Sequence, residues 1–144
     1  MKTILETKSI TKKYQGRAVI EDISIRLQEG ELVGLLGISG SGKSTLFNVV
    51  SGLLMPEQGK VLLEGEDVTG KTGLVSYMQQ KDLLLPHKTV IDNVSLPLLL
   101  KGINKKEARA QASAYLPQFG LEGKADKYPG QLSGGMRQRA ALLR

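Results

Sequence analysis

The sequence of 144 residues contains no cysteine and only one histidine, His87. Disulfide bonds, thiolate nucleophiles and cysteine-based zinc sites are therefore excluded, and a single imidazole cannot form a histidine metal cluster. Aromatic residues are also scarce, at 4% of the chain, so a bound nucleic acid would find few rings on which to stack its bases. Any catalysis must rest on other groups.

No run of apolar residues is long enough to cross a bilayer, which takes about 20 of them. The best run, residues 94–100, is short and contains Ser95 and Pro97. The N-terminal residues meet charged side chains at once and lack the apolar stretch of a secretory signal. We therefore expect a cytoplasmic protein.

The charge of +6 has no single interpretation, because nucleic acid, an anionic membrane or a phosphate-bearing ligand would each suit it. The basic residues occur as scattered pairs, such as Lys12–Lys13 and Lys105–Lys106, and form no dense stripe. We expect most of them to lie on a solvated face of one compact domain.

The apolar pattern of the first half predicts an α/β fold. Residues 4–10 and 23–27 are typical of antiparallel strands, and the continuous apolar run 31–36 is typical of a parallel strand covered on both faces. Further strands are expected at 59–64 and 74–78. The sheet should thus continue to about Gln79.

Helices are expected at three places. Apolar residues at helical spacing predict a helix over 43–51. Asn104 and Glu107 have the spacing of an N-cap and its partner, at the start of a helix that Pro117 should end or kink. Strong helix formers then fill residues 136–144.

A glycine-rich segment lies between the expected strand 31–36 and the helix that follows it. Residues 37–45, GISGSGKST, fit the P-loop pattern GxxxxGK(S/T). Glycines let backbone N–H groups converge on phosphate oxygens at a helix N-terminus, while Lys43 is expected to neutralise the β- and γ-phosphates and Ser44 to bind Mg²⁺. The expected ATP-binding residues are Gly37, Ser39, Gly40, Ser41, Gly42, Lys43, Ser44 and Thr45. The alternative is a glycine turn that binds nothing.

A P-loop fixes the ligand class but leaves the reaction open, since kinases, GTPases, helicases and transporters share it. A second small-residue turn, Leu132-Ser133-Gly134-Gly135, opens the last helix and offers another set of N–H groups for phosphate. Taken alone, it is equally an ordinary helix cap with Ser133 as the N-cap residue.

Together the two segments resemble the Walker A loop and the signature motif, here LSGGMRQR, of ABC ATPases. The resemblance covers essentially the whole chain. It implies an incomplete P-loop NTPase core with an N-terminal antiparallel β subdomain and a helical ABC-type subdomain. The β-rich part and P-loop core would occupy about residues 1–80, and the helical part about residues 81–144.

The resemblance also implies roles for single residues. Tyr14 resembles the aromatic residue that stacks on adenine, and Gln80 resembles the Q-loop glutamine, which links the γ-phosphate and Mg²⁺ to the helical subdomain. Ser133, Gly134 and Gly135 would contact ATP held by a second copy. Two alternatives stay open: Tyr14 as a packed core aromatic, and Gln79 in place of Gln80.

In the family, the segment after this glutamine docks on a membrane-spanning partner. Its leucines would form that docking surface or the core of the helical subdomain, and we expect core for most of Leu83, Leu84, Leu85, Leu96, Leu98, Leu99 and Leu100.

Family members carry further catalytic residues after the signature helix: an Asp for Mg²⁺, a Glu that activates water, and a His. The sequence ends at Arg144, before all three. Glu64 follows three apolar residues, one fewer than the run that precedes the family's Asp. His87 lies before the signature and so is not the family's histidine. We therefore expect the 144-residue chain to have almost no ATPase activity and, because strand 31–36 lacks neighbours, to be marginally stable or aggregation-prone.

The resemblance identifies the chain as a part of the ATP-hydrolysing subunit of an ABC transporter. The segments GKSTLFNVVSGLL and YMQQKDLLLP resemble importers of nitrate, sulfonate, taurine and thiamine precursors, although Ile38 and Met136 stand where many relatives have Pro and Gln. The resemblance implies a head-to-tail homodimer that sandwiches ATP between its two copies. It also implies a separate transmembrane permease and a position on the inner face of the cell membrane.

Two other hypotheses remain. A soluble ABC ATPase acting on ribosomes or DNA would usually have two cassettes or a coiled-coil insertion, and the 90-residue interval from Lys43 to Ser133 has no sustained heptads. An unrelated P-loop kinase would make Ser133 an accidental cap.

Overall fold

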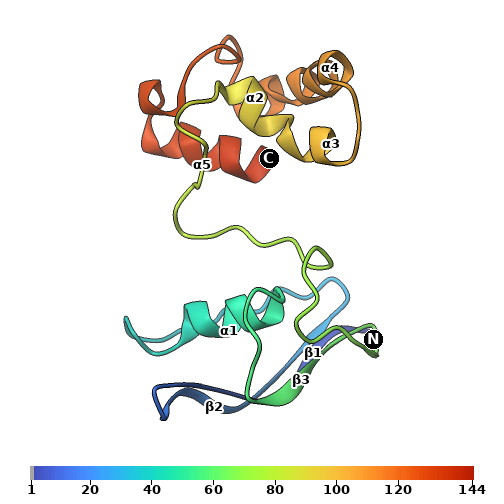
Figure 1. Ribbon diagram of the computed structural model, residues 1–144, viewed down its shortest axis with the longest axis vertical. Helices are drawn as coiled ribbons and strands as arrows, with labels where there is room; N and C mark the ends of the chain where they lie inside the picture. The colour runs from blue at the N-terminus through green and yellow to red at the C-terminus, as the bar shows by residue number, and fades with distance from the viewer. Residues whose placement is uncertain (1) are drawn as a thin grey trace. The chain divides into compact units, whose positions relative to one another are not determined.

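The computed structural model describes residues 2–144. They form two compact units, unit 1 up to Tyr77 and unit 2 from Met78 to Arg144 (Figure 1). Within residues 2–144, no helix has the length and apolar character needed to span a membrane.

Unit 1 is built on a four-stranded antiparallel sheet. Its strands are β1 (Thr3–Tyr14), β2 (Arg17–Gln28), β3 (Gln58–Leu63) and β4 (Glu66–Asp67), in the order β2-β1-β3-β4. The expected strands at 4–10, 23–27 and 59–64 are confirmed, as is the antiparallel pairing of the first two.

One helix, α1 (Lys43–Val50), completes the core of unit 1. It buries Leu46 and Val49 beside Ile10, Ile20 and Val61 of the strands. The apolar residues at helical spacing thus give α1 one buried face, as the sequence predicts.

The strand expected at 31–36 is absent. Leu32 and Leu36 are 97% and 96% exposed, and the segment joins no sheet. An extended backbone becomes a strand only when a neighbour accepts and donates its hydrogen bonds, and within residues 2–144 no strand lies along this one. Leu32 and Leu36 therefore remain in solvent, whereas Leu35 packs against the core of unit 1.

The expected strand at 74–78 is also absent, so the sheet ends at Asp67 and does not reach Gln79. Leu74 is 52% exposed, and Tyr77 stacks on Phe47 of α1 with ring centroids 6.1 Å apart. The end of unit 1 is thus held by side-chain packing on the helix and by no strand pairing.

Unit 2 is helical. It contains α2 (Val90–Val94), α3 (Leu96–Leu100), α4 (Lys105–Tyr115) and α5 (Gly134–Leu143), with short 3-10 turns η1 (Pro117–Phe119) and η2 (Pro129–Gln131). The Asn104 side chain accepts the Glu107 N–H at 3.0 Å, and α4 ends before Pro117, both as expected. The core comprises Leu84, Val90, Ile91, Val94, Ala112, Leu116, Leu121, Leu132 and Ala140.

The leucines of residues 83–100 are mostly outside this core. Only Leu84 is buried, whereas Leu83 and Leu100 are 49% and 81% exposed and the other four are partly buried. The expectation of core positions for most of them is therefore wrong. Instead, Asn93, with its side chain fully buried, fastens the preceding loop by accepting the Leu85 N–H at 2.7 Å.

Candidate functional site

The P-loop segment contains a glycine, Gly42, that lies directly against β2. Gly40 and Gly42 have φ values of +81° and +89°, which side chains disfavour. A Cβ atom added at Gly42 would lie 2.8 Å from the Val19 carbonyl oxygen and 2.5 Å from Ile20 Cγ2. Only glycine at residue 42 therefore lets the loop enter α1 at this place.

The Lys43 ammonium lies within the loop. It donates to the carbonyl oxygens of Gly37 at 2.7 Å and Ile38 at 2.6 Å, and to Ser41 Oγ at 3.2 Å. In the described part of the chain, no carboxylate lies within 4.0 Å of it. Its positive charge is thus held among neutral oxygens.

The start of α1 supplies a second positive element. Its N-cap residue, Gly42, has no side chain to accept the first N–H groups, and no acidic residue stands in the first turn. The unpaired N–H groups and the helix dipole both favour an anion at this end. Ser44, in the same turn, is exposed.

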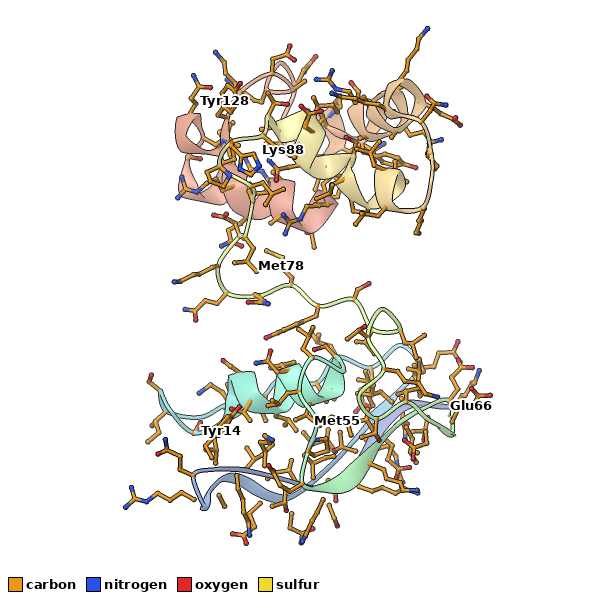
Figure 2. The ribbon with its side chains drawn as sticks, viewed as in Figure 1. Tyr14, Met55, Glu66, Met78, Lys88 and Tyr128 are labelled. Carbon is orange, nitrogen blue, oxygen red and sulfur yellow. The ribbon has the colours of Figure 1, made fainter. Side chains whose placement is uncertain are left out.

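Tyr14 lies at the end of the β1–β2 ribbon that the P-loop approaches. It pairs with Arg17 across the turn and is 48% exposed, so it is not a core aromatic (Figure 2). Val19, which Gly42 contacts, is two residues along β2 from Arg17, or about 7 Å. The fold therefore places the aromatic ring and the loop at one end of the ribbon.

A lysine and a carboxylate hold this end of the ribbon in place. Lys12 Nζ lies 5.6 Å from the centre of the Tyr14 ring and 2.7 Å from Glu57 Oε1. The hydrogen bond from Lys12, together with the Lys13 N–H, holds the pKa of the Glu57 carboxyl below its ordinary value. Glu57 therefore keeps its charge and fixes Lys12 near the ring.

The signature turn is in unit 2, where Ser133 is the N-cap of α5. Its hydroxyl accepts the Met136 N–H at 3.3 Å, while Gly134 and Gly135 are exposed. The cap role that local chemistry suggested is thus confirmed. A contact of these residues with nucleotide remains a prediction.

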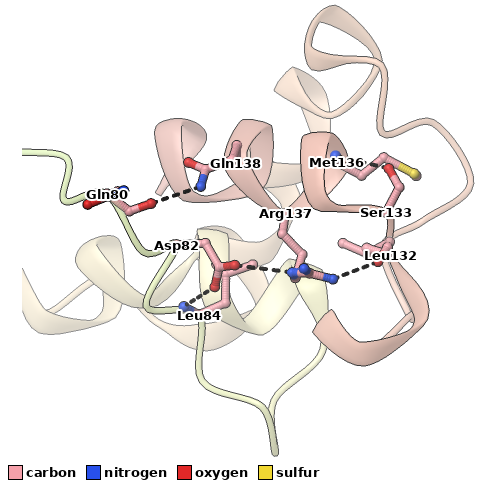
Figure 3. A network of polar contacts seen from close by, with 8 residues as sticks. All are labelled: Gln80, Asp82, Leu84, Leu132, Ser133, Met136, Arg137 and Gln138. Carbon is pink, nitrogen blue, oxygen red and sulfur yellow. Dashed lines mark hydrogen bonds and ion pairs between the residues drawn. The ribbon is translucent and has the colours of Figure 1, made fainter.

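Helix α5 is fastened to the segment that contains Gln80 (Figure 3). Arg137 Nε lies 3.1 Å from Asp82 Oδ2 while its Nη1 donates to the Leu132 carbonyl at 2.9 Å, and Gln138 Nε2 donates to the Gln80 carbonyl at 3.1 Å. The backbone of Gln80 is thus bonded to α5, whereas the residue itself is exposed. Asp82 and Arg137 could not be recognised as partners from the sequence, because ion-pair partners 55 positions apart leave no local pattern.

Glu64 and His87, which are of the same residue types as two of the family's later catalytic residues, have other surroundings in the fold. Glu64 stands in the turn after β3 and pairs with Lys2 at 2.9 Å. His87 is an exposed loop residue of unit 2. Residues 2–144 contain no group of three or more His, Cys, Asp or Glu that could hold a metal ion.

A family model described as ABC transporter matches residues 20–144, which include the P-loop, the Gln80 segment and the signature turn. The chain belongs to the ABC transporter family. Its fold class is accordingly that of an α/β ABC nucleotide-binding domain, as the sequence predicts.

Two relatives of this ABC chain are named as import ATP-binding proteins. It is 44% identical to the formylaminopyrimidine import ATP-binding protein of Halalkalibacterium halodurans, over 100% of the chain and 56% of the relative. It is 40% identical to the taurine import ATP-binding protein of Pseudomonas aeruginosa, over 94% of the chain and 52% of the relative. The ABC chain thus spans about half the length of these relatives.

A solved structure gives the same result for the fold. The ABC chain superposes with a TM-score of 0.83 and 30% identity on a dimeric ATP-binding cassette in a post-hydrolysis state with ADP and Pi. The match covers 97% of the ABC chain and 68% of that cassette.

Proposed function

We propose that this chain is the ATP-binding part of the ATP-hydrolysing subunit of an ABC importer. Its similarity to two import ATP-binding proteins supports the importer class. In this proposal, ATP binding and hydrolysis drive a separate transmembrane permease, and the chain works on the inner face of the cell membrane.

The position of Lys43 carries the proposal. Its ammonium lies in a glycine loop at the mouth of an uncapped helix, and no carboxylate of residues 2–144 pairs with it. Ammonium–phosphate hydrogen bonds are shorter and about twice as strong as bonds between neutral groups. A triphosphate would therefore displace the carbonyl partners of Lys43.

The proposed roles of the other residues follow from their elements. The backbone N–H groups of residues 37–45 hold the phosphates, and the exposed ring of Tyr14 stacks on adenine. Residues 133–135 contact ATP held by a second copy in a head-to-tail dimer, an arrangement that the dimeric state of the solved cassette supports.

Ser44 and Gln80 are the proposed Mg²⁺ ligands. A hydroxyl and an amide oxygen suit this ion, which prefers oxygen ligands and keeps several waters, and both residues are exposed. When bound, Mg²⁺ supplies positive charge that offsets the phosphate oxygens.

Replacing Lys43 tests nucleotide binding. Lys43→Ala should weaken Mg-ATP affinity at least about tenfold, because one charge-assisted contact is worth about 1.5–3 kcal/mol. Isothermal titration calorimetry would measure it, with Lys8→Ala, an exposed lysine of β1, as the control that keeps wild-type affinity. Equal affinity in the Lys43 and Lys8 variants would end the proposal.

Hydrolysis by these 144 residues should be close to background. Glu64, the carboxylate nearest in pattern to the family's Asp, is engaged with Lys2, and without a positioned group the attacking water is not activated. Steady-state phosphate release by the purified chain would measure this. A rate on the order of 1–10 per second, as in ordinary enzymes, would contradict the expectation.

A further inference from the structure

The net positive charge of the chain lies entirely in unit 2. Unit 1 contains nine Lys and Arg and nine Asp and Glu, so its formal charges cancel. The remaining eleven basic and five acidic residues give unit 2 all of the +6. The basic residues are divided almost equally between the units, so the charge of unit 2 reflects its smaller number of acidic residues.

A groove on unit 2 gathers part of this charge along α4. It has a volume of about 730 Å³ and is lined on one side by Lys105, Lys106, Arg109 and Ser113. These residues recur at helical spacing and so form one stripe of α4. Three cations thus face the groove from a single helix.

The opposite wall is a loop that backbone hydrogen bonds hold in place. Ala125 and Asp126 line it. The Ala125 carbonyl accepts the Ile91 N–H at 3.0 Å, and the Lys127 carbonyl accepts the Val90 N–H at 2.8 Å. Because both bonds tie the loop to the start of α2, the groove is preformed.

Most of the cations at this groove have no acidic partner. Arg109 pairs with Asp92 at 3.3 Å, but within residues 2–144 no carboxylate lies within 4.0 Å of the ammonium groups of Lys105 or Lys106. These two lysines stand in the first turn of α4, where the helix dipole disfavours positive charge. This arrangement costs folding stability, and such local conflicts are typical of functional surfaces.

We propose that this groove binds an extended acidic segment of a partner protein. The pair Lys105–Lys106 and Arg109 are about 6 Å apart along the helix axis. Carboxylates at alternate positions of an extended chain lie on one side, about 7 Å apart, and so match this spacing. Asp126 can accept a backbone N–H of the segment.

The lining of the site suits a polypeptide. The groove is open, and beside its charged residues it includes the small apolar side chains of Ala110 and Ala125. A narrow chain can enter it and place its Cβ atoms against these alanines. The groove contains no P-loop residue, so this proposal does not depend on nucleotide binding.

Fluorescence anisotropy with a labelled peptide tests the proposal on the full chain. The probe Gly-Ala-Glu-Ala-Glu-Ala-Glu-Gly should bind at least about tenfold more tightly than the same peptide with Gln for Glu, and its affinity should fall as salt rises. The double variant Lys105→Glu, Lys106→Glu should lose at least about tenfold in affinity for the Glu peptide.

A second double variant separates the groove from general attraction to a basic protein. Lys8→Glu, Lys60→Glu makes the same change in net charge on exposed lysines of unit 1, and should keep wild-type affinity within about twofold. Acidic residues suit the first turn of α4, so K105E/K106E should keep its helical circular dichroism. The neutral variant Lys105→Gln, Lys106→Gln should show an intermediate loss.

Two kinds of result would overturn the proposal. Equal loss in the two charge-reversed double variants, or none in either, overturns the proposal. Inositol hexakisphosphate and vesicles containing phosphatidylserine serve as the other anionic probes. If either one binds in a manner that depends on Lys105 and Lys106 while the Glu peptide does not bind, the groove is a phosphate or membrane site and the peptide assignment is wrong.

Discussion

At the scale of single residues, a threonine hydroxyl sets the acidity of Asp67 at the end of β4. The hydroxyl of Thr69 donates to Asp67 Oδ1 at 2.7 Å and the Thr69 N–H donates to it at 3.0 Å. These bonds, with Lys60 3.3 Å away, lower the pKa of Asp67 from 3.8 to about 2. The Thr69 hydroxyl also accepts the Val61 N–H at 3.0 Å.

Thr69→Val should therefore raise the pKa of Asp67 toward 3.8. Since the folded-state pKa is the lower one, the ionised carboxylate stabilises the fold above about pH 4, and this stabilisation is lost as pH falls toward 2. A carbonyl-detected NMR titration would measure the pKa, with Thr69→Ser as the hydroxyl-retaining control. A midpoint near 2 in the valine variant would show that the hydroxyl is not responsible.

Single residues also show what sequence chemistry can and cannot reveal. The P-loop was recognisable because glycines, lysine and hydroxyls are adjacent in the chain, and their local conformation follows from those residues. The burial of Asn93 was not recognisable, because a polar residue between apolar ones indicates an exposed position by default. Its fully buried amide bonds to loop backbone groups five and eight positions back, which no periodic pattern signals.

At the scale of elements, α5 carries two arginines with different partners. Arg137 holds Asp82 in the Gln80 segment, whereas Arg139 donates to the Phe119 carbonyl at 2.8 Å. Arg137→Ala should speed amide hydrogen exchange in residues 80–84 by roughly two- to tenfold, since a partly exposed ion pair contributes about 0.5–1.5 kcal/mol. Hydrogen-exchange mass spectrometry would detect this.

Arg139→Ala is the matched control on the same helix, and it should leave exchange in residues 80–84 unchanged. Exchange that accelerates equally in both variants would mean that α5 as a whole had loosened, and that the Asp82 contact has no particular role in ordering this segment.

Elements with local causes were predictable, and those that need distant partners were not. The capped start of α4 and the turn-linked pair β1–β2 follow from residues near each other in the chain. The apolar run 31–36 has strong strand character, but its strand state depends on neighbours that residues 2–144 do not supply. The sequence of this run suits a buried strand, whereas in the structure Leu32 and Leu36 are exposed and the run is unpaired within residues 2–144.

At the scale of the whole molecule, this exposed run should govern solubility. Leu32 and Leu36 are almost fully exposed on a backbone that no strand of residues 2–144 pairs with, and such segments promote edge-to-edge association. Leu32→Ser, Leu36→Ser should reduce light scattering at equal protein concentration without lowering the melting temperature. Leu142→Ser, at a 63% exposed position of α5, is the control and should change scattering less. Equal effects would mean that exposed leucines act irrespective of their backbone.

The uneven division of charge has a preparative consequence. If the chain were cut once near the junction of its two units, the N-terminal piece would carry no net formal charge and the C-terminal piece would carry +6. On a cation-exchange column at neutral pH, the first piece would pass in the flow-through and the second would be retained until the salt gradient. A single chromatographic step would thus yield each half for separate study.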